Sequence, residues 1–267
     1  MNVLMAGTDT VYSGVELAIY TLMNHNRNVN IYILNMDIDI VNEETHSVTH
    51  YRKFLDWQIH KLEKIVKYFD SNSNIKFIDC KEIYLRYLDN SVNRNSDFTP
   101  LAAVRLCADI LLPYLDNVLY LDCDTAVTGD LSEFYDSFSK KDITYGAYVV
   151  EEACDGNGEM ISGVMFMNLD KMRRTGFLNR ARDNYRRNLY RFPDQSAIRD
   201  AGGNFEKFSP DYGYCDNLDD FDGLPLIIHF TNKIEPKIYY SKSRKFFFKK
   251  FPFLKYANEG IMMLDEV

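Results

Sequence analysis

The sequence predicts an α/β fold in which a mixed, mostly parallel central sheet carries helices on its faces. Short apolar runs typical of buried strands alternate along the first half of the chain with longer stretches of helical periodicity. With 267 residues and a hydrophobic content of 46%, the chain can form one principal domain with a large core. These observations favour a Rossmann-like arrangement of strands and helices.

The chain opens with a strand, a polar turn and a helix. An apolar strand is expected at residues 2–6, turn-forming residues follow at 7–10, and apolar residues at helical spacing predict a helix around 15–22. A second strand at 30–34 completes a βαβ unit, which implies parallel pairing and a right-handed crossover. Such an opening is typical of nucleotide-binding domains.

The later elements continue this alternation and then lose its regularity. A polar loop at 151–159 separates two of the later strands, and a small helical, aromatic and basic tail at 241–267 follows a domain of residues 1–240. Helices are predicted over 49–69, 101–112, 172–190 and 194–201, and strands over 75–78, 118–121, 143–149, 163–168 and 225–229.

Charge and cysteine content limit the possible partners and compartments. A formal net charge of −8 argues against a nucleic-acid partner, because such binding needs a concentrated basic face. The five cysteines form no CxxC pair and leave at least one thiol unpaired, which favours the reducing cytoplasm. No signal peptide is visible, and no segment reaches the ~18 apolar residues that a membrane span requires. Any membrane contact is therefore expected to be peripheral.

Two carboxylates follow the apolar strand at 118–121. Asp122 and Asp124 are separated by Cys123, and residues i and i+2 of an extended chain project to the same side. Both side chains can therefore reach one cation at the carboxyl edge of the sheet, and their hard oxygen atoms favour Mn²⁺ or Mg²⁺. The alternative, two surface aspartates that merely close a strand, is disfavoured by the apolar strand and the nucleotide-type opening before them.

The order of these motifs resembles glycosyltransferase family 8, whose members are retaining galactosyl- and glucosyltransferases with the GT-A fold. The turn at residues 6–12 is similar to the family's uridine-binding turn, and 119–124 is similar to its metal-binding strand. The segments 161–169 and 229–237 resemble its sugar-binding and diphosphate-binding segments. Over residues 1–240, the resemblance implies a UDP-hexose donor, Mn²⁺ or Mg²⁺ as cofactor, and a glycan or lipid-linked acceptor.

The resemblance also implies individual roles. Asp122, Asp124 and His229 correspond to the metal ligands, and Asp194 and Gln195 to the residues beside the reacting sugar. Because a glutamine amide is a poor nucleophile, we expect front-face attack by the acceptor hydroxyl. The expected nucleotide-sugar-binding residues are Ala6, Thr8, Thr10, Tyr12, Arg105, Asp122, Cys123, Asp124, Ser162, Gly163, Asn232, Lys233 and Lys237.

Several of these residues also have a plain structural explanation. His229 could be a packed histidine, Asp194 the N-cap of a helix, Arg105 a solvated charge and Gly163 a bend at a strand edge. If Gly163 has a functional role instead, its missing side chain would allow a sugar to approach closely.

The sequence departs from the family pattern in two segments. Ile161 and Ser162 stand where the family has Asn-Ala, which leaves the donor sugar undefined. In the late segment, Asn232, Glu235 and Lys237 replace the family's Gly, Lys and Trp. Either Lys233 or Lys237 is therefore expected to supply the positive charge that usually faces the diphosphate, or the donor is expected to bind more weakly.

The tail from 237 to 256 interleaves cationic and aromatic residues. This composition fits a segment that docks on anionic lipid at the cytoplasmic face of a membrane, with a core-capping helix as the alternative.

Two other functions compete with the transferase. The residues around Asp122 also resemble the nucleophile motif of haloacid dehalogenase-type phosphatases, with 218–222 as the later acidic motif. The loss of lysine at Glu235 is compatible with a non-catalytic nucleotide-sugar binder.

Overall fold

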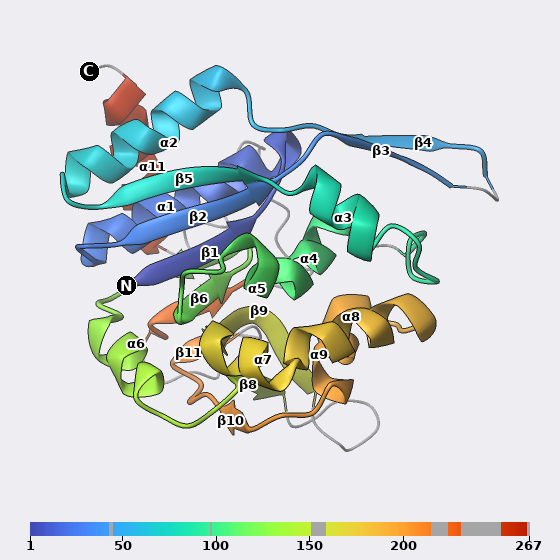
Figure 1. Cartoon of the computed structure of the whole chain (residues 1–267). Helices are drawn as coiled ribbons and strands as arrows, with labels where there is room; N and C mark the ends of the chain where they lie inside the picture. The colour runs from blue at the N-terminus through green and yellow to red at the C-terminus, as the bar shows by residue number, and fades with distance from the viewer. Residues whose placement is uncertain (43–44, 97, 151–158, 215–223, 231–251, 266–267) are drawn as a thin grey trace.

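The computed structural model describes residues 1–42, 45–96, 98–150, 159–214, 224–230 and 252–265, and at its centre is a seven-stranded mixed sheet (Figure 1). The strand order is β10-β8-β9-β6-β1-β2-β5. β1 pairs in parallel with β2 and β6, whereas β9 pairs antiparallel with β6 and β8. The predicted mixed, mostly parallel sheet is confirmed. The strands are β1 Asn2–Ala6, β2 Asn30–Asn35, β5 Asn74–Asp79, β6 Asn117–Leu121, β8 Tyr145–Val150, β9 Glu159–Asn168 and β10 Phe205–Lys207.

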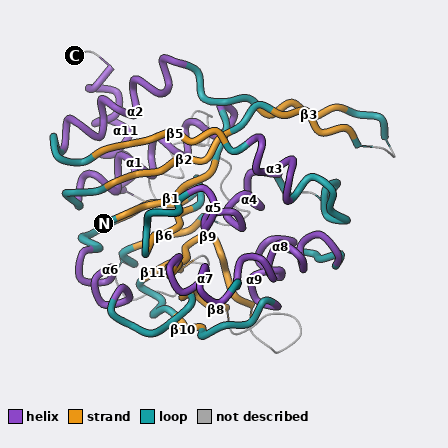
Figure 2. Tube along the Cα trace, viewed as in Figure 1, coloured by secondary structure: helices purple, strands orange, loops and turns teal. Residues whose placement is uncertain are grey.

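Two hydrophobic cores cover the two faces of this sheet. Successive side chains of a strand point to opposite faces, so Val3 and Met5 enter one core while Leu4 and Ala6 enter the other. α1 (Tyr12–His25), α2 (Asp56–Phe69) and α6 (Ser132–Ser139) pack in the first core. Six further helices cover the opposite face, as Figure 2 shows. They are α3 Lys81–Tyr87, α4 Pro100–Val104, α5 Ala108–Leu111, α7 Leu169–Thr175, α8 Phe177–Arg187 and α9 Pro193–Asp200.

A small second sheet joins segments that are far apart in the sequence. Its order is β11-β12-β7, with β11 at Tyr212–Tyr214, β12 at Ile227–His229 and β7 at Thr125–Val127. β12 pairs antiparallel with β7, and His229 lies opposite Thr125. This pairing brings the end of β12 beside the residues that follow β6.

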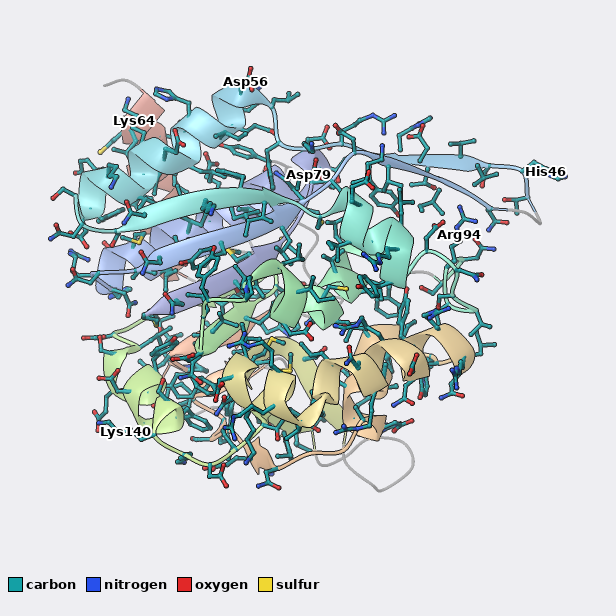
Figure 3. The ribbon with its side chains drawn as sticks, in the orientation of Figure 1. His46, Asp56, Lys64, Asp79, Arg94 and Lys140 are labelled. Carbon is teal, nitrogen blue, oxygen red and sulfur yellow. The ribbon has the colours of Figure 1, made fainter. Side chains whose placement is uncertain are left out.

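A hairpin of β3 (Ile38–Val41) and β4 (Val48–Tyr51) projects from the body of the molecule (Figure 1), with His46 near its tip (Figure 3). The helix predicted over 49–69 is therefore wrong in its first part, because α2 begins at Asp56. Residues 48–51 pair with β3 instead. The hairpin contributes bonds that the local helical pattern cannot reveal, since strand preference depends on cross-strand neighbours.

Two other predicted helices are interrupted. The helix expected over 101–112 consists of α4, the 3-10 turn η2 (Arg105–Cys107) and α5. The helix expected over 172–190 divides into α7 and α8 at Gly176, whose φ of 62° lies in the left-handed region. A second 3-10 turn, η1 (Asp9–Val11), precedes α1.

The last helix, α11 (Pro252–Asp265), packs against α1 (Figure 1). Lys64 of α2 donates a hydrogen bond of 3.0 Å to the carbonyl of Leu264. Ala257, Ile261 and Leu264 are buried. For residues 252–265 this is the arrangement of a core-capping helix, whereas 241–251 lie outside the described residues. None of the described helices is long and apolar enough to span a bilayer.

Candidate active site

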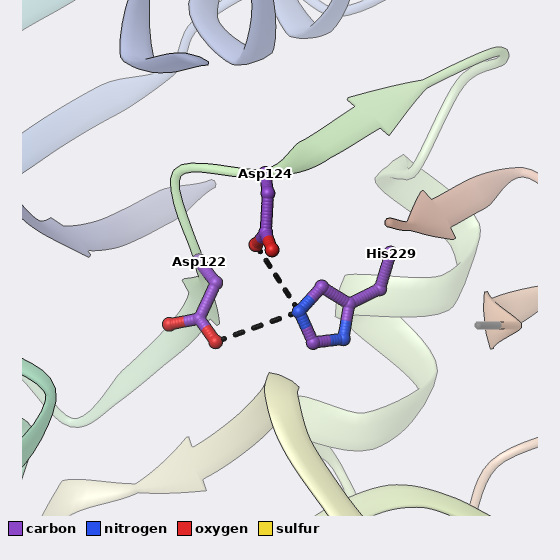
Figure 4. Close-up of side chains that lie close together, drawn as sticks. All are labelled: Asp122, Asp124 and His229. Atoms are coloured by element: carbon purple, nitrogen blue, oxygen red, sulfur yellow. Dashed lines mark ion pairs between the residues drawn. The ribbon is translucent and has the colours of Figure 1, made fainter. Parts of the chain in front are cut away.

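Asp122, Asp124 and His229 converge where β6 ends, as Figure 4 shows. Nε2 of His229 lies 3.1 Å from Oδ1 of Asp124 and 3.6 Å from Oδ2 of Asp122. One ligand atom from each residue falls within 4.8 Å of the others. Two carboxylates and one imidazole form a donor set that suits Mn²⁺ or another hard to intermediate divalent ion.

The backbone on both sides of the aspartates is held by neighbouring strands. Asp122 N–H donates to the Gly163 carbonyl at 2.7 Å, and Thr125 Oγ1 donates to the Asp122 carbonyl at 2.8 Å. Phe230 N–H donates to the Asp124 carbonyl at 2.9 Å. The backbone that carries the two carboxylates is therefore hydrogen-bonded to β9 and to the residue after β12.

The imidazole of His229 lies directly against Gly163 in β9. A Cβ at residue 163 would overlap the ring of His229. Burial alone would lower the pKa of His229, but the facing Asp124 and Asp122 carboxylates raise it above its ordinary value. A bound divalent cation would reverse this balance by favouring the neutral imidazole.

Arg105 is a buried cation that links two of the site's acids. Only 2% of it is exposed, and its guanidinium lies 3.1 Å from both Asp122 Oδ1 and Asp194 Oδ2. It also lies 4.1 Å from the ring centroid of Tyr120. Burial opposes its charge, but the carboxylates, Asp122 foremost, raise the pKa of Arg105 above its usual value. The solvated-charge alternative for Arg105 is therefore wrong.

A β-bulge in β9 exposes backbone groups to the site. Ala147 and Tyr148 are consecutive in β8, yet their partners in β9 are Met165 and Ile161. The backbone of Ser162 can therefore serve the site: its carbonyl accepts a hydrogen bond of 2.6 Å from Arg105 Nη1.

Asp194 and Gln195 lie in the first turn of α9. The N-cap of this helix is Phe192, so the N-cap alternative for Asp194 is wrong. Burial raises the pKa of Asp194, and the neighbouring Arg105 partly opposes this shift. Gln195 Oε1 accepts a hydrogen bond of 3.0 Å from Ser162 N–H, which fastens the glutamine to the bulge.

The turn after β1 forms another wall of the site. Thr8 Oγ1 and Thr10 Oγ1 are hydrogen-bonded at 3.0 Å, and Cys123 Sγ donates to the Ala6 carbonyl at 3.0 Å. Tyr12 does not line the cavity; its hydroxyl donates a hydrogen bond of 2.6 Å to Glu16 Oε1, one turn further along α1.

A cavity of about 530 Å³ joins these walls. Of the residues expected at the site, it is lined by Ala6, Thr8, Thr10, Arg105, Asp122, Cys123, Asp124, Ser162, Gly163, Asp194, Gln195 and His229. Asn232, Lys233 and Lys237 lie outside the described residues.

Other cavity residues were missed by the sequence reasoning. Tyr120 donates a hydrogen bond of 2.7 Å to Asp122 Oδ1, and its position two residues before the aspartate could have indicated this. Phe98 and Phe192 meet edge to face at 5.8 Å and form an apolar wall. Glu159 contacts Gln195, and no local sequence signal points to it.

This sheet, with a candidate metal-ligand cluster that lines a cavity at its edge, defines a glycosyltransferase of the GT-A fold. The chain belongs to glycosyl transferase family 8, whose family model matches residues 2–199. Enzymes of this family use a divalent metal and a UDP-sugar donor, whose sugar they transfer to an acceptor. Family membership therefore excludes the phosphatase alternative.

Solved structures of other glycosyltransferases share the fold. The bifunctional glycosyltransferase WbbM superposes with a TM-score of 0.68 at 15% identity, over 88% of this chain and 46% of that one. GlyE of Streptococcus pneumoniae gives 0.60 at 21% identity, over 90% and 59%. This chain thus spans about half the length of these two proteins. The galactosyltransferase LgtC, solved with donor and acceptor sugar analogues, gives 0.62 at 16% identity, over 88% and 89%. Comparison with curated proteins returned no sequence match.

Proposed function

We propose that this protein is a Mn²⁺-dependent retaining hexosyltransferase that moves galactose or glucose from a UDP-sugar to a glycan or lipid-linked acceptor in cell-surface polysaccharide synthesis. The observation that carries the proposal is the convergence of Asp122, Asp124 and His229 on one wall of a 530 Å³ cavity. The turn after β1, which also lines the cavity, offers the hydroxyl groups of Thr8 and Thr10 to a nucleoside.

Asp122, Asp124 and His229 would hold the metal ion. When bound, the ion neutralises the charge that develops on the departing diphosphate. Arg105 holds Asp122 through Oδ1, which leaves the other carboxylate oxygen directed at His229. We propose that Arg105 thereby fixes the direction of Asp122 and lowers the repulsion among the site's acids.

The donor sugar would lie between the metal cluster and the start of α9. Asp194 is buried beside Arg105 and presents a carboxylate as an acceptor for sugar hydroxyls. Gln195 is an amide and a poor nucleophile, so retention is proposed to follow front-face attack, with a donor phosphate oxygen taking the acceptor's proton. Gly163 would serve the site by leaving space for the His229 ring. Because the ring fills that space, we propose no direct contact between Gly163 and the sugar.

The test is UDP release from UDP-glucose, UDP-galactose and UDP-N-acetylhexosamines as Mn²⁺ is titrated. Metal-dependent release from one donor, lost in Asp124→Asn and kept in the exposed control Asp183→Asn, supports the proposal and identifies the sugar. Retained binding of UDP-sugar without turnover, with any acceptor or with water, would instead identify a non-catalytic binder.

We further propose that the acceptor is lipid-linked and that the protein works on the cytoplasmic face of a membrane. The cationic and aromatic residues from 237 to 256 support this proposal, as do two exposed methionines of α11, Met262 (56%) and Met263 (68%). Sedimentation with phosphatidylglycerol vesicles, compared with phosphatidylcholine vesicles and repeated at high salt, tests it. Equal binding to both, or none, contradicts the lipid contact.

A further inference from the structure

Gln195 is held at both ends of its amide by groups of opposite hydrogen-bonding character. Its Oε1 accepts from Ser162 N–H at 3.0 Å, and its Nε2 donates to Glu159 Oε1 at 3.2 Å. A backbone N–H can donate but cannot accept, whereas an ionised carboxylate can accept but cannot donate. The two partners together therefore permit a single orientation of the amide, without the ambiguity that usually attends glutamine side chains.

The bulge in β9 makes this arrangement possible. Glu159 begins β9 and pairs with Val150, and the strand then departs from β8 between Ile161 and Met165. Ser162 N–H is thereby available to Gln195. Glu159 and Ser162 of β9 therefore bind the two ends of the Gln195 amide, which extends from α9.

The remaining N–H of Gln195 Nε2 has no hydrogen-bond partner among the described residues, and Gln195 lines the cavity. If the amide turned over, Oε1 would face the Glu159 carboxylate and Nε2 would face the Ser162 N–H. Both contacts would then be repulsive, so the observed orientation is favoured. In this orientation Glu159 holds Nε2, and with it the second N–H of the amide, at the cavity wall.

We propose that Glu159 is a positioning residue of the transferase: it orients the Gln195 amide so that an N–H, and not the carbonyl oxygen, meets the donor sugar. This inference rests on the proposed function, and it adds a residue outside the segments that carry the family resemblance. Glu159 acts through Gln195 and is expected to affect turnover more than donor affinity.

Kinetics of a small set of variants test the proposal. Glu159→Ala should lower kcat by about ten- to a hundredfold, the effect expected on losing a hydrogen bond to a charged group, with little change in donor KM. Glu159→Gln keeps an acceptor oxygen and should recover most of the activity. Glu133→Ala, which removes an exposed glutamate of α6, is the matched control. Equal losses in Glu159→Gln and Glu159→Ala would mean that an acceptor oxygen at residue 159 does not support turnover, and would overturn the proposal.

A double-mutant cycle asks whether Glu159 acts through Gln195. In a Gln195→Ala background, Glu159→Ala should cause no further loss of kcat. Multiplicative losses would show independent roles, which is contrary to the proposal.

Nuclear magnetic resonance gives a readout that does not need activity. The sequence contains two glutamines, Gln58 and Gln195, so selective ¹⁵N-glutamine labelling yields two side-chain ¹⁵N resonances, each with a pair of amide proton signals. Glu159→Ala should shift the Gln195 signal and leave that of Gln58 in place. An unchanged Gln195 signal overturns the contact. A wild-type protein that releases no UDP, yet shows the shift, would overturn the proposed function and keep the orientation of Gln195 by Glu159.

Discussion

The imidazole of His229 occupies the space that a side chain at Gly163 would need. β9 therefore accepts the metal-ligand candidate only because residue 163 lacks a Cβ. We predict that Gly163→Ala displaces the imidazole and lowers Mn²⁺ affinity by about tenfold or more, the range seen when groups that orient a ligand are lost. Isothermal titration calorimetry with Mn²⁺ and UDP measures the affinity.

The same variant should lower the free energy of unfolding by about 1–3 kcal/mol, because it overpacks a closed site. In a His229→Ala background the methyl group has room, so Gly163→Ala should then be nearly neutral. Equal destabilisation in both backgrounds would mean that the clash lies elsewhere.

Metal binding should stabilise the folded protein through the three converging ligands. Asp122, Asp124 and His229 lie within reach of one ion, so Mn²⁺ at about 100 times its Kd should add ~2.7 kcal/mol. We expect calorimetry to show a higher Tm with Mn²⁺ and UDP, reversed by EDTA. Asp124→Asn should lose most of this increase. A Tm that rises equally in Asp124→Asn would place the ion at another site.

Removal of Arg105 should destabilise the fold strongly. Its guanidinium compensates Asp122 and Asp194, and loss of one partner from a buried ion pair costs about 3–5 kcal/mol. Arg105→Met should lower the stability to urea accordingly. Arg174→Met removes an arginine that is 65% exposed and pairs with Asp170, and should change stability by less than about 1 kcal/mol. Similar losses in the two variants would refute the role given to Arg105.

The ionisation of Asp70 should make the free energy of unfolding depend on pH. Its carboxylate accepts hydrogen bonds from Ser73 Oγ and from the backbone N–H groups of Asn28 and Asn72, which lower its pKa from 3.8 to about 2. A lowered pKa in the folded state gives a stability contribution that is present above pH 3.8 and lost as pH falls towards 2. Asp70→Asn should therefore be less stable than wild type at pH 6, with a difference that narrows between pH 4 and pH 2. Urea unfolding over this range measures it, and a difference independent of pH contradicts the cause.

The packing of α11 against the domain can be tested by substituting one buried and one exposed residue of the helix. Ile261 is 8% exposed and Met263 is 68% exposed. Ile261→Asp would place a charge against the domain and should lower Tm by several degrees, whereas Met263→Asp should leave Tm unchanged. Neither should alter the affinity for UDP, because no described residue of α11 lines the cavity. A normal Tm in Ile261→Asp would mean that the helix is not docked in solution.

The parts of this protein that the sequence determines are those governed by neighbouring residues. The apolar run at 118–121 is enough to predict a buried strand, and the spacing of Asp122 and Asp124 is enough to predict that both face one cation. The opening strand, turn and helix, and hence the parallel pairing of β1 and β2, follow for the same reason.

Tertiary structure decides what depends on segments far apart in the chain. The pairing of β12 with β7 places His229 beside the aspartates, and the register shift between β8 and β9 frees Ser162 for Gln195. The β3–β4 hairpin replaces a predicted helix for the same reason, since its bonds join residues that no local window compares. Whether Arg105 meets solvent or two carboxylates is likewise a matter of packing, because a lone arginine in a helical pattern fits either surrounding. The local sequence therefore predicted strands β1, β2, β5 and β6 and the acidic motif, whereas long-range pairing determined the hairpin and the completed site.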